Sequence, residues 1–211
     1  ADQPESLAET VRELTRREML YEHPRVADRV YVFRHALVQE VAYSTLLEQR
    51  RAPLHCRAAR ALETLYDRRT DEVVELLAHH FGRSGDAEKA VDYAILAGEK
   101  AQRRWANAEG LAHFGAALSR LDALPESPAN SLRRIDAVLR QGEVRFAVGQ
   151  HVEQRTLLEQ IGPLVERAAD PPRRAAWHFW TGFLHTLTGG RPELVIGPAL
   201  GGVVVAQEGA R

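Results

Sequence analysis

The chain has 211 residues, 45% of them hydrophobic, which is enough to bury one large core or two small ones. Its 28 lysines and arginines nearly balance 29 aspartates and glutamates, so a net charge of −1 gives no global field for nucleic acid or acidic membranes. No apolar run is long enough to span a membrane, and the single cysteine, Cys56, excludes an internal disulfide framework and indicates a reducing, cytoplasmic setting.

The first fifty residues combine helical and extended patterns. Apolar residues spaced by three or four predict a short helix over 7–17. Two apolar or β-branched runs, 19–22 and 30–33, flank a polar tip and predict a two-stranded hairpin. Helical spacing resumes at Ala36, and a break is expected over 50–53, where Pro53 suits the first turn of a new helix. That helix is expected to bury a stripe of apolar residues: Leu54, Ala58, Ala61, Leu62 and Leu65.

The middle of the chain has the most regular helical pattern. A helix over 74–81 is followed by a Ser-Gly-Asp sequence at 84–86, which supplies a turn and an N-cap. The next helix has a stripe of small side chains that lets a neighbouring helix approach closely: Ala87, Ala90, Ala94, Ala97 and Ala101. A third helix follows from Asn107. The prolines at 125 and 128 mark a loop, at which we place a boundary between subdomains.

Helical spacing continues beyond that loop. It predicts helices over 132–146 and 157–165, with a turn at Gly149 between them. A further helix opens at Asp170 and is expected to end at the glycine pair 189–190. Its apolar stripe is Ala176, Phe179 and Phe183. The last stretch, 192–206, contains glycines and a proline, so we expect a kinked or frayed helix.

A small residue seven positions before a glycine turn occurs three times, in the pairs Ala78/Gly85, Gly142/Gly149 and Gly182/Gly189. Around the first pair, Leu77, Phe81 and Ala90 fall where a tetratricopeptide repeat places packing residues. The sequence therefore predicts an all-α fold, a tetratricopeptide-like α-solenoid of antiparallel helix pairs, preceded by a partial winged helix with a short β-hairpin. A non-repeating helical bundle with chance glycine turns is the alternative.

A family resemblance is found where YVFRHALVQEVAYSTLLEQRRAPLHCRAARALETLY is followed by LLAHHFGRSGDAEKAVDYAILAGEKA. This junction resembles bacterial STAND-type signalling ATPases, in which a nucleotide-binding domain is followed by a winged helix and then by tetratricopeptide repeats. Some members of that family also have an N-terminal class III adenylate cyclase domain or a DNA-binding domain. The resemblance covers about 7–124, and the sequence does not contain the P-loop or the acidic metal-binding strand of the ATPase.

The resemblance implies a domain division. Residues 1–50 would be the C-terminal part of a winged-helix-like domain. Residues 51–125 would hold linking helices and the first tetratricopeptide-like repeats, and 126–211 would hold further repeat-like helical hairpins. Because the only methionine is Met19, we also expect the chain to be a segment of a larger multidomain signalling protein.

The resemblance also singles out His35. It falls where related plant and animal STAND proteins have a Met-His-Asp motif, whose histidine touches the β-phosphate of bound ADP. An imidazole at a helix start can donate a hydrogen bond to such an anion. Here Phe33 and Arg34 precede the histidine and Ala36 replaces the acid, so a histidine that merely caps or packs this joint is the other interpretation. ATP or ADP would be bound by the parent protein, and no cofactor is expected in this segment.

Two residue groups can be compared with known catalytic and metal sites. His79 and His80 are adjacent on a predicted helix, so their side chains point apart, and no third ligand follows at metal-site spacing. Ser44 and Cys56 lack the neighbours of an activated nucleophile. We therefore predict neither a metal site nor a catalytic residue.

Two further groups are candidates for partner binding. Trp177 and Trp180 can line a peptide groove, although tryptophans at helical spacing also pack in cores. A group of arginines could face phosphate or an acidic domain, while a solvated helix face is the ordinary explanation: Arg50, Arg51, Arg57 and Arg60.

Three functions remain open from the sequence. The leading one is a non-catalytic regulatory segment of a STAND-type ATPase, with a protein or peptide partner on the solenoid and an adjacent nucleotide-binding domain in the same chain. An alternative is part of an enzyme chain whose ATP hydrolysis or cyclic AMP synthesis lies in other domains. The third is a winged-helix DNA-binding regulator. It would use Arg12, Arg16 and Arg17 to contact DNA. The negative charges of Glu9, Glu13 and Glu18 oppose contact with its phosphates.

Overall fold

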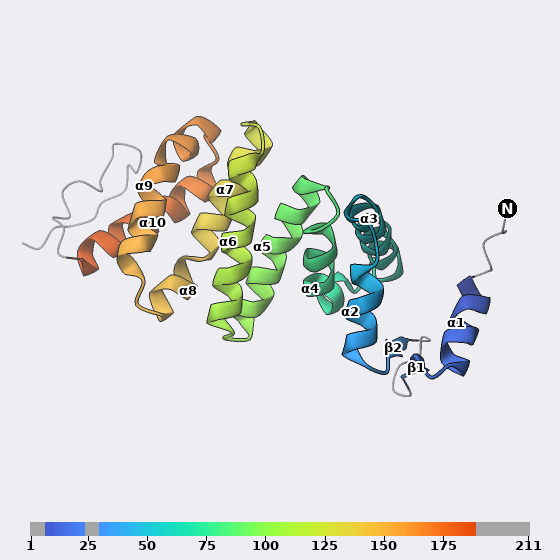
Figure 1. Cartoon of the computed structure of the whole chain (residues 1–211). Coiled ribbons are helices and arrows are strands. Elements are labelled where there is room, and N and C mark those ends of the chain that lie inside the picture. The colour runs from blue at the N-terminus through green and yellow to red at the C-terminus, as the bar shows by residue number, and fades with distance from the viewer. Residues whose placement is uncertain (1–6, 24–29, 189–211) are drawn as a thin grey trace, which may run out of the picture. The chain divides into compact units, whose positions relative to one another are not determined.

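The computed structural model describes residues 7–23 and 30–188, which form mostly helices and a small antiparallel sheet (Figure 1). The elements are α1 (Leu7–Arg16), β1 (Leu20–Glu22), β2 (Tyr31–Phe33), α2 (Ala36–Ser44), α3 (Glu48–Leu65), α4 (Thr70–Phe81), α5 (Ala87–Arg103), α6 (Asn107–Ala123), α7 (Pro128–Arg140), α8 (Gly142–Ala147), α9 (His151–Ala168) and α10 (Pro171–Leu187). The prediction of a mainly α-helical chain with one short hairpin is therefore confirmed. The helix predicted over 192–206 lies outside the described residues.

The chain divides into two compact units, Ala1–Ala52 and Pro53–Arg211. The division falls inside α3, so this single continuous helix contributes residues to both units. The second unit continues past the loop at 125–128, because α6 packs on α7. The domain limits at 50 and 125 that the resemblance implies stay predictions.

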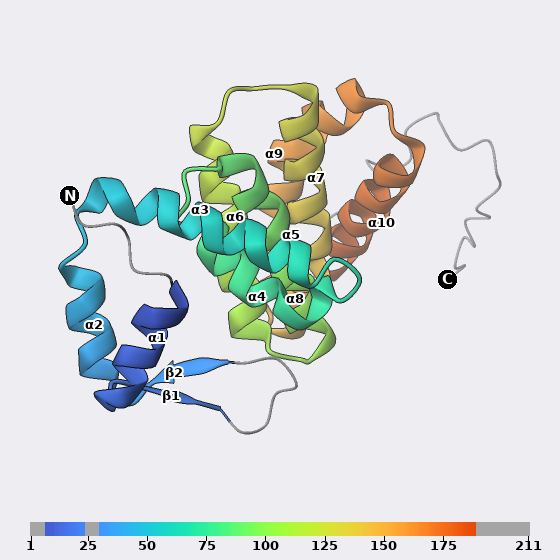
Figure 2. The same cartoon turned by 90° about the vertical axis from the view of Figure 1, so that its right-hand side faces the viewer.

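The first unit contains the predicted hairpin. Strands β1 and β2 pair antiparallel with Leu20 opposite Phe33, and α1 lies against β1 (Figure 2). Between α1 and β1, Glu18 takes a left-handed conformation (φ 56°), which reverses the chain. Leu20 is buried, whereas α1 and α2 contain no buried residue. The hairpin thus forms where the sequence predicts it, but this unit has only a small core.

The start of α3 differs from the prediction of a break at 50–53. The break lies at 45–47 instead, and Pro53 is inside the helix. The Arg51 side chain explains this difference, because its guanidinium donates to the Leu46 carbonyl at 3.0 Å and to the Ser44 carbonyl at 3.1 Å. These bonds satisfy one carbonyl at the end of α2 and one in the break, and they hold the first turn of α3 beside them. One missing backbone hydrogen bond at Pro53 is tolerated in return.

The buried face of α3 is also different from the predicted one. Leu54 and Leu65 are 42% and 60% exposed, while Ala59 is fully buried and packs on α4. The observed stripe is His55, Ala59, Leu62 and Tyr66. The prediction chose the more apolar face of the helix. The structure buries the face with Ala59, which packs in one cluster with Val73, Leu77 and Phe81 of α4.

In the second unit, helices that follow one another in sequence pack side by side (Figure 1). Close neighbours are α4 with α5, α5 with α6, α7 with α9, and α9 with α10. Contacts also join α5 to α7 and α7 to α10, two helices further along the chain in the first case and three in the second. Each helix from α5 to α9 therefore contacts at least two other helices.

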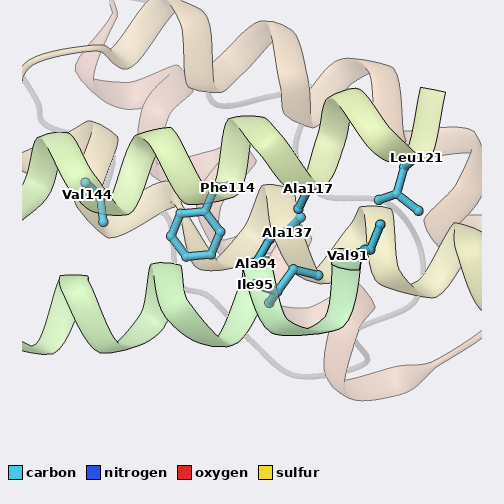
Figure 3. Packing of buried hydrophobic residues seen from close by; sticks show 8 residues of the cluster. All are labelled: Val91, Ala94, Ile95, Phe114, Ala117, Leu121, Ala137 and Val144. Carbon is cyan, nitrogen blue, oxygen red and sulfur yellow. The ribbon is translucent and has the colours of Figure 1, made fainter. Parts of the chain in front are cut away.

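Small residues let α5 and α6 approach closely. The predicted alanine stripe is buried at Ala90, Ala94, Ala97 and Ala101. Figure 3 shows Phe114 of α6 in a cluster with Ala94, Ala117 and Ala137. A Cβ atom on Gly98 would lie 2.9 Å from the Phe114 ring, so the ring fills the space that a side chain on α5 would need.

The glycine turns at Gly85 and Gly149 have the conformation that the sequence predicts. Their φ angles are +83° and +78°, the left-handed region that glycine adopts without strain. After Gly85, the Asp86 carboxylate accepts the Lys89 backbone N–H at 3.3 Å and caps α5. The third predicted turn, at Gly189, lies outside the described residues.

The helix predicted over 132–146 is divided into α7 and α8 at Gln141. Gln154 of α9 is buried, and its amide donates to the Val138 carbonyl at 2.9 Å. A side chain that takes a carbonyl of the helix ladder is a common cause of a kink. The break lets Gly142 start α8 directly against α10.

The Gly98–Phe114 contact gives a stability prediction. Gly98→Ala should destabilise the chain by about 1–3 kcal/mol, because the added methyl overpacks the buried ring. In Gly115→Ala the new Cβ meets open space in the middle of α6, and the gain in helix propensity should stabilise the chain by about 0.5–1 kcal/mol. Urea unfolding of both variants measures this difference. Equal stability of the two variants would show that the close approach is not a constraint.

Candidate functional site

The candidate site is a hollow on the face formed by α5, α7, α8 and α10. Its volume is 430 Å³, and it combines one aromatic residue with four charged ones. We call it the Trp180 groove and define it by its lining residues: Glu99, Gln102, Arg103, Leu139, Arg140, Glu143, Ala176 and Trp180. Convergent polar groups around an apolar surface are typical of binding sites.

A second hollow, of 460 Å³, lies between α7 and α9. Its lining includes Leu132 and Leu164, and an ion pair of 2.7 Å joins Arg167 and Glu126 beside it. It has no aromatic side chain, and part of its wall is formed by Glu126 and Ser127, which precede α7. We place the candidate site in the Trp180 groove, because that groove offers an aromatic surface together with charges from three separate helices.

Trp180 of α10 is held in the groove by a close contact between its ring and Gly142 of α8. A Cβ atom on Gly142 would lie 2.8 Å from the Trp180 indole, so only glycine leaves room for the ring at this position. Phe183 adds an edge-on contact with a centroid distance of 6.0 Å. Trp180 is thereby fixed as a half-buried platform with little rotamer freedom left to lose on binding.

Polar contacts join the helices of the groove, while its fourth charged residue, Arg103, pairs with Asp71 outside it. Arg140 forms an ion pair with Glu99, and the Gln102 amide donates to the Glu143 carboxylate at 2.5 Å. Burial lowers the pKa of Arg140, and the positive charge of Arg173 lowers it further. Such a surface offers both signs of charge.

Trp177 has a different environment from Trp180. Its indole N–H donates to the Leu158 carbonyl of α9 at 2.8 Å, and its ring packs 3.2 Å from the Cβ position of Gly162. It also lies against the core cluster around Leu158 and Ile161. The two tryptophans predicted to bind a partner therefore face different neighbours, and of the two only Trp180 lines the groove.

His35 lies at the N-cap position of α2, as the sequence predicts. Its backbone is extended (φ −130°, ψ 128°), and its carbonyl accepts the Val38 N–H at 3.0 Å. The imidazole is exposed and makes no capping hydrogen bond to the helix. This geometry establishes where His35 lies. A contact with nucleotide stays a prediction.

The other arginine groups lie mostly in solvent or in local ion pairs. Arg50, Arg57 and Arg60 are exposed. On α1, the Glu13 carboxylate forms ion pairs with Arg16 at 2.8 Å and with Arg17 at 2.6 Å. Two of the three arginines considered for DNA contact are therefore paired within their own helix.

The structure brings together a histidine cluster that the sequence did not predict. His55 of α3 contacts His80 of α4, with their Nδ1 atoms 2.9 Å apart, and His79 lies beside both rings. The pairing of α3 with α4 was not visible in the sequence, because the predicted stripe of α3 pointed His55 away from the core. Within 7–23 and 30–188, no group of three His, Cys, Asp or Glu side chains is arranged to hold a metal ion.

No helix of the described ranges is long and apolar enough to cross a membrane. The chain matched no protein-family model, no curated protein and no solved structure.

The Gly142–Trp180 contact can be measured with a double-mutant cycle. Gly142→Ala should destabilise the wild-type chain, because the methyl collides with the indole. In a Trp180→Ala background the same change should cost little, which gives a coupling energy of about 1–2 kcal/mol. Additive effects on the free energy of urea unfolding would mean that Gly142 does not position Trp180.

Proposed function

We propose that the chain is a non-catalytic regulatory segment that binds a protein or peptide partner in the Trp180 groove. The observation that carries the proposal is the Trp180 indole fixed against Gly142 between paired charges. Rigid aromatic residues surrounded by polar groups are typical hot spots of protein interfaces. In this proposal the parent is a signalling protein similar to bacterial STAND-type ATPases.

The helix contacts support a tetratricopeptide-like solenoid. In that arrangement α5/α6 and α7–α8/α9 are successive pairs, and the first helices of neighbouring pairs touch each other. Gly98, Gly142 and Gly182 lie on α5, α8 and α10, three of the four helices that line the groove. In this proposal Gly98, and not Ala78, is the small residue of the first repeat that corresponds to Gly142 and Gly182 in the later ones.

An apolar surface on the first unit supports a contact with another domain. Leu37 and Val41 lie one turn apart on α2 and are 69% and 53% exposed, and Leu47 is 66% exposed. Clustered exposed apolar residues mark interaction sites. In the proposal this surface packs on the adjacent nucleotide-binding domain, where His35 would lie near ADP. The bound nucleotide then belongs to that domain, and this segment holds no cofactor.

Partner binding can be tested with peptides selected from a random phage-displayed library. Peptides that bind the wild-type chain should bind the Trp180→Ala variant at least about tenfold more weakly, a loss of about 1.4 kcal/mol, because the variant lacks the aromatic platform. Fluorescence anisotropy of labelled peptides measures the affinity, and circular dichroism checks that each variant is folded.

Trp105→Ala is the matched control. Trp105 is 82% exposed between α5 and α6 and does not line the groove, so its removal should leave the affinity unchanged. Peptides that bind Trp180→Ala as well as the wild type, or that depend on Trp105, would rule out the groove as the binding site.

The alternative of an enzyme predicts activity in other domains of the parent, so this chain should not catalyse. Release of phosphate from ATP and formation of cyclic AMP should both stay at background with the purified chain, because its sequence contains no P-loop. Turnover that rises with the concentration of the chain and persists through repeated purification would contradict a non-catalytic segment.

A further inference from the structure

The histidine cluster joins α3 to α4. His55 lies one helical turn before Ala59, the buried residue through which α3 packs on α4. Its ring centroid is 5.1 Å from that of His80 and 5.8 Å from that of His79, and the rings of His79 and His80 are 5.2 Å apart. Three imidazoles therefore meet at one end of the contact between these two helices.

The hydrogen bonds of the cluster depend on the protonation of the rings. A bond between the Nδ1 atoms of His55 and His80 needs a proton on one nitrogen and a lone pair on the other. The Arg83 guanidinium lies 3.0 Å from Nδ1 of His79, and because arginine can only donate, that nitrogen must accept. Both bonds are lost when every ring is an imidazolium.

The charges around the cluster oppose protonation. Burial lowers the pKa of all three histidines, and the positive charge of Arg83 lowers each of them further. The charge of His80 acts in the same direction on the pKa of both His55 and His79.

The nearby carboxylates of α3 and α4 are directed at other cations. Glu63 of α3 accepts from Lys89 and Tyr93 of α5. Glu75 of α4 pairs with Lys100 and Arg104. On the face of α5 that packs on α4, the Lys89 ammonium lies over the Phe81 ring.

We propose that the cluster of His55, His79 and His80 is a pH-sensitive latch that holds α3 on α4 at neutral pH and releases it on acidification. Because α3 is continuous across the division at Ala52 and Pro53, the latch acts on the helix that connects the two units. This inference concerns α3 and α4 and is independent of the Trp180 groove.

Linkage gives the direction of the pH effect. The three histidines have a lowered pKa in the folded chain, so the unfolded chain binds their protons more readily. Their contribution to stability is complete above the ordinary value of 6.5. It is lost as the pH falls below 6.5 toward the lowered values. Each unit of pKa difference corresponds to a factor of about ten in the folding equilibrium.

Hydrogen exchange with mass spectrometry tests the latch in the intact chain. From pH 7.5 to 5.5, exchange at 54–65, corrected for intrinsic rates, should rise at least about tenfold relative to α6. The increase should be absent in His55→Gln/His80→Gln and unchanged in His113→Gln, whose ring lies 3.8 Å from Glu109 on α6. An equal rise in the double variant, or no rise in the wild type, would overturn the proposal.

A second measurement avoids variants that fail to fold. Histidine ring resonances of the wild-type chain should show three titrations below pH 6.5, accompanied by loss of backbone protection at 54–65. If the three rings titrate at or above 6.5, the latch does not exist.

Discussion

The second unit depends on the absence of a side chain at two glycines. At Gly98 the missing Cβ leaves space for the Phe114 ring, and at Gly142 it leaves space for the Trp180 indole. Close approach lets a few aromatic rings fill the interhelical space at the density that a core requires. The Gly98 contact joins α5 to α6 and the Gly142 contact joins α8 to α10, and α5, α8 and α10 are three of the helices that line the groove.

Local patterns in the sequence were enough to predict much of the fold. The hairpin, the turns at Gly85 and Gly149 and the alanine stripe of α5 depend on short-range chemistry, and the structure has all three. The orientation of α3 depends on its partner. Leu54 and Leu65 are more hydrophobic than His55 and Ala59, and alanines lie on both faces, but it is Ala59 that packs in the core cluster with α4. A single sequence does not show which helix α3 packs against, and so it does not show which face of α3 is buried.

The candidate site was predicted only in part, for the same reason. Trp177 and Trp180 have similar local sequence, and their roles differ because α9 lies against one and α8 against the other. Phe179, predicted to lie in the apolar stripe of α10, is 63% exposed. The histidine cluster required two residues of α4 and one of α3, which are 24 and 25 positions apart. Spacing along one helix cannot reveal such a cluster.

The proposed partner binding and the proposed pH response arise from two separate features of the second unit. The Trp180 groove offers a fixed aromatic surface for a partner, and the histidine cluster offers a contact whose strength depends on pH. The most direct test of partner binding is ¹⁵N NMR of the three tryptophan indoles during titration with a selected peptide. The account predicts that the Trp180 signal shifts while those of Trp105 and Trp177 stay in place. A shift of Trp105 with an unchanged Trp180 signal would contradict it.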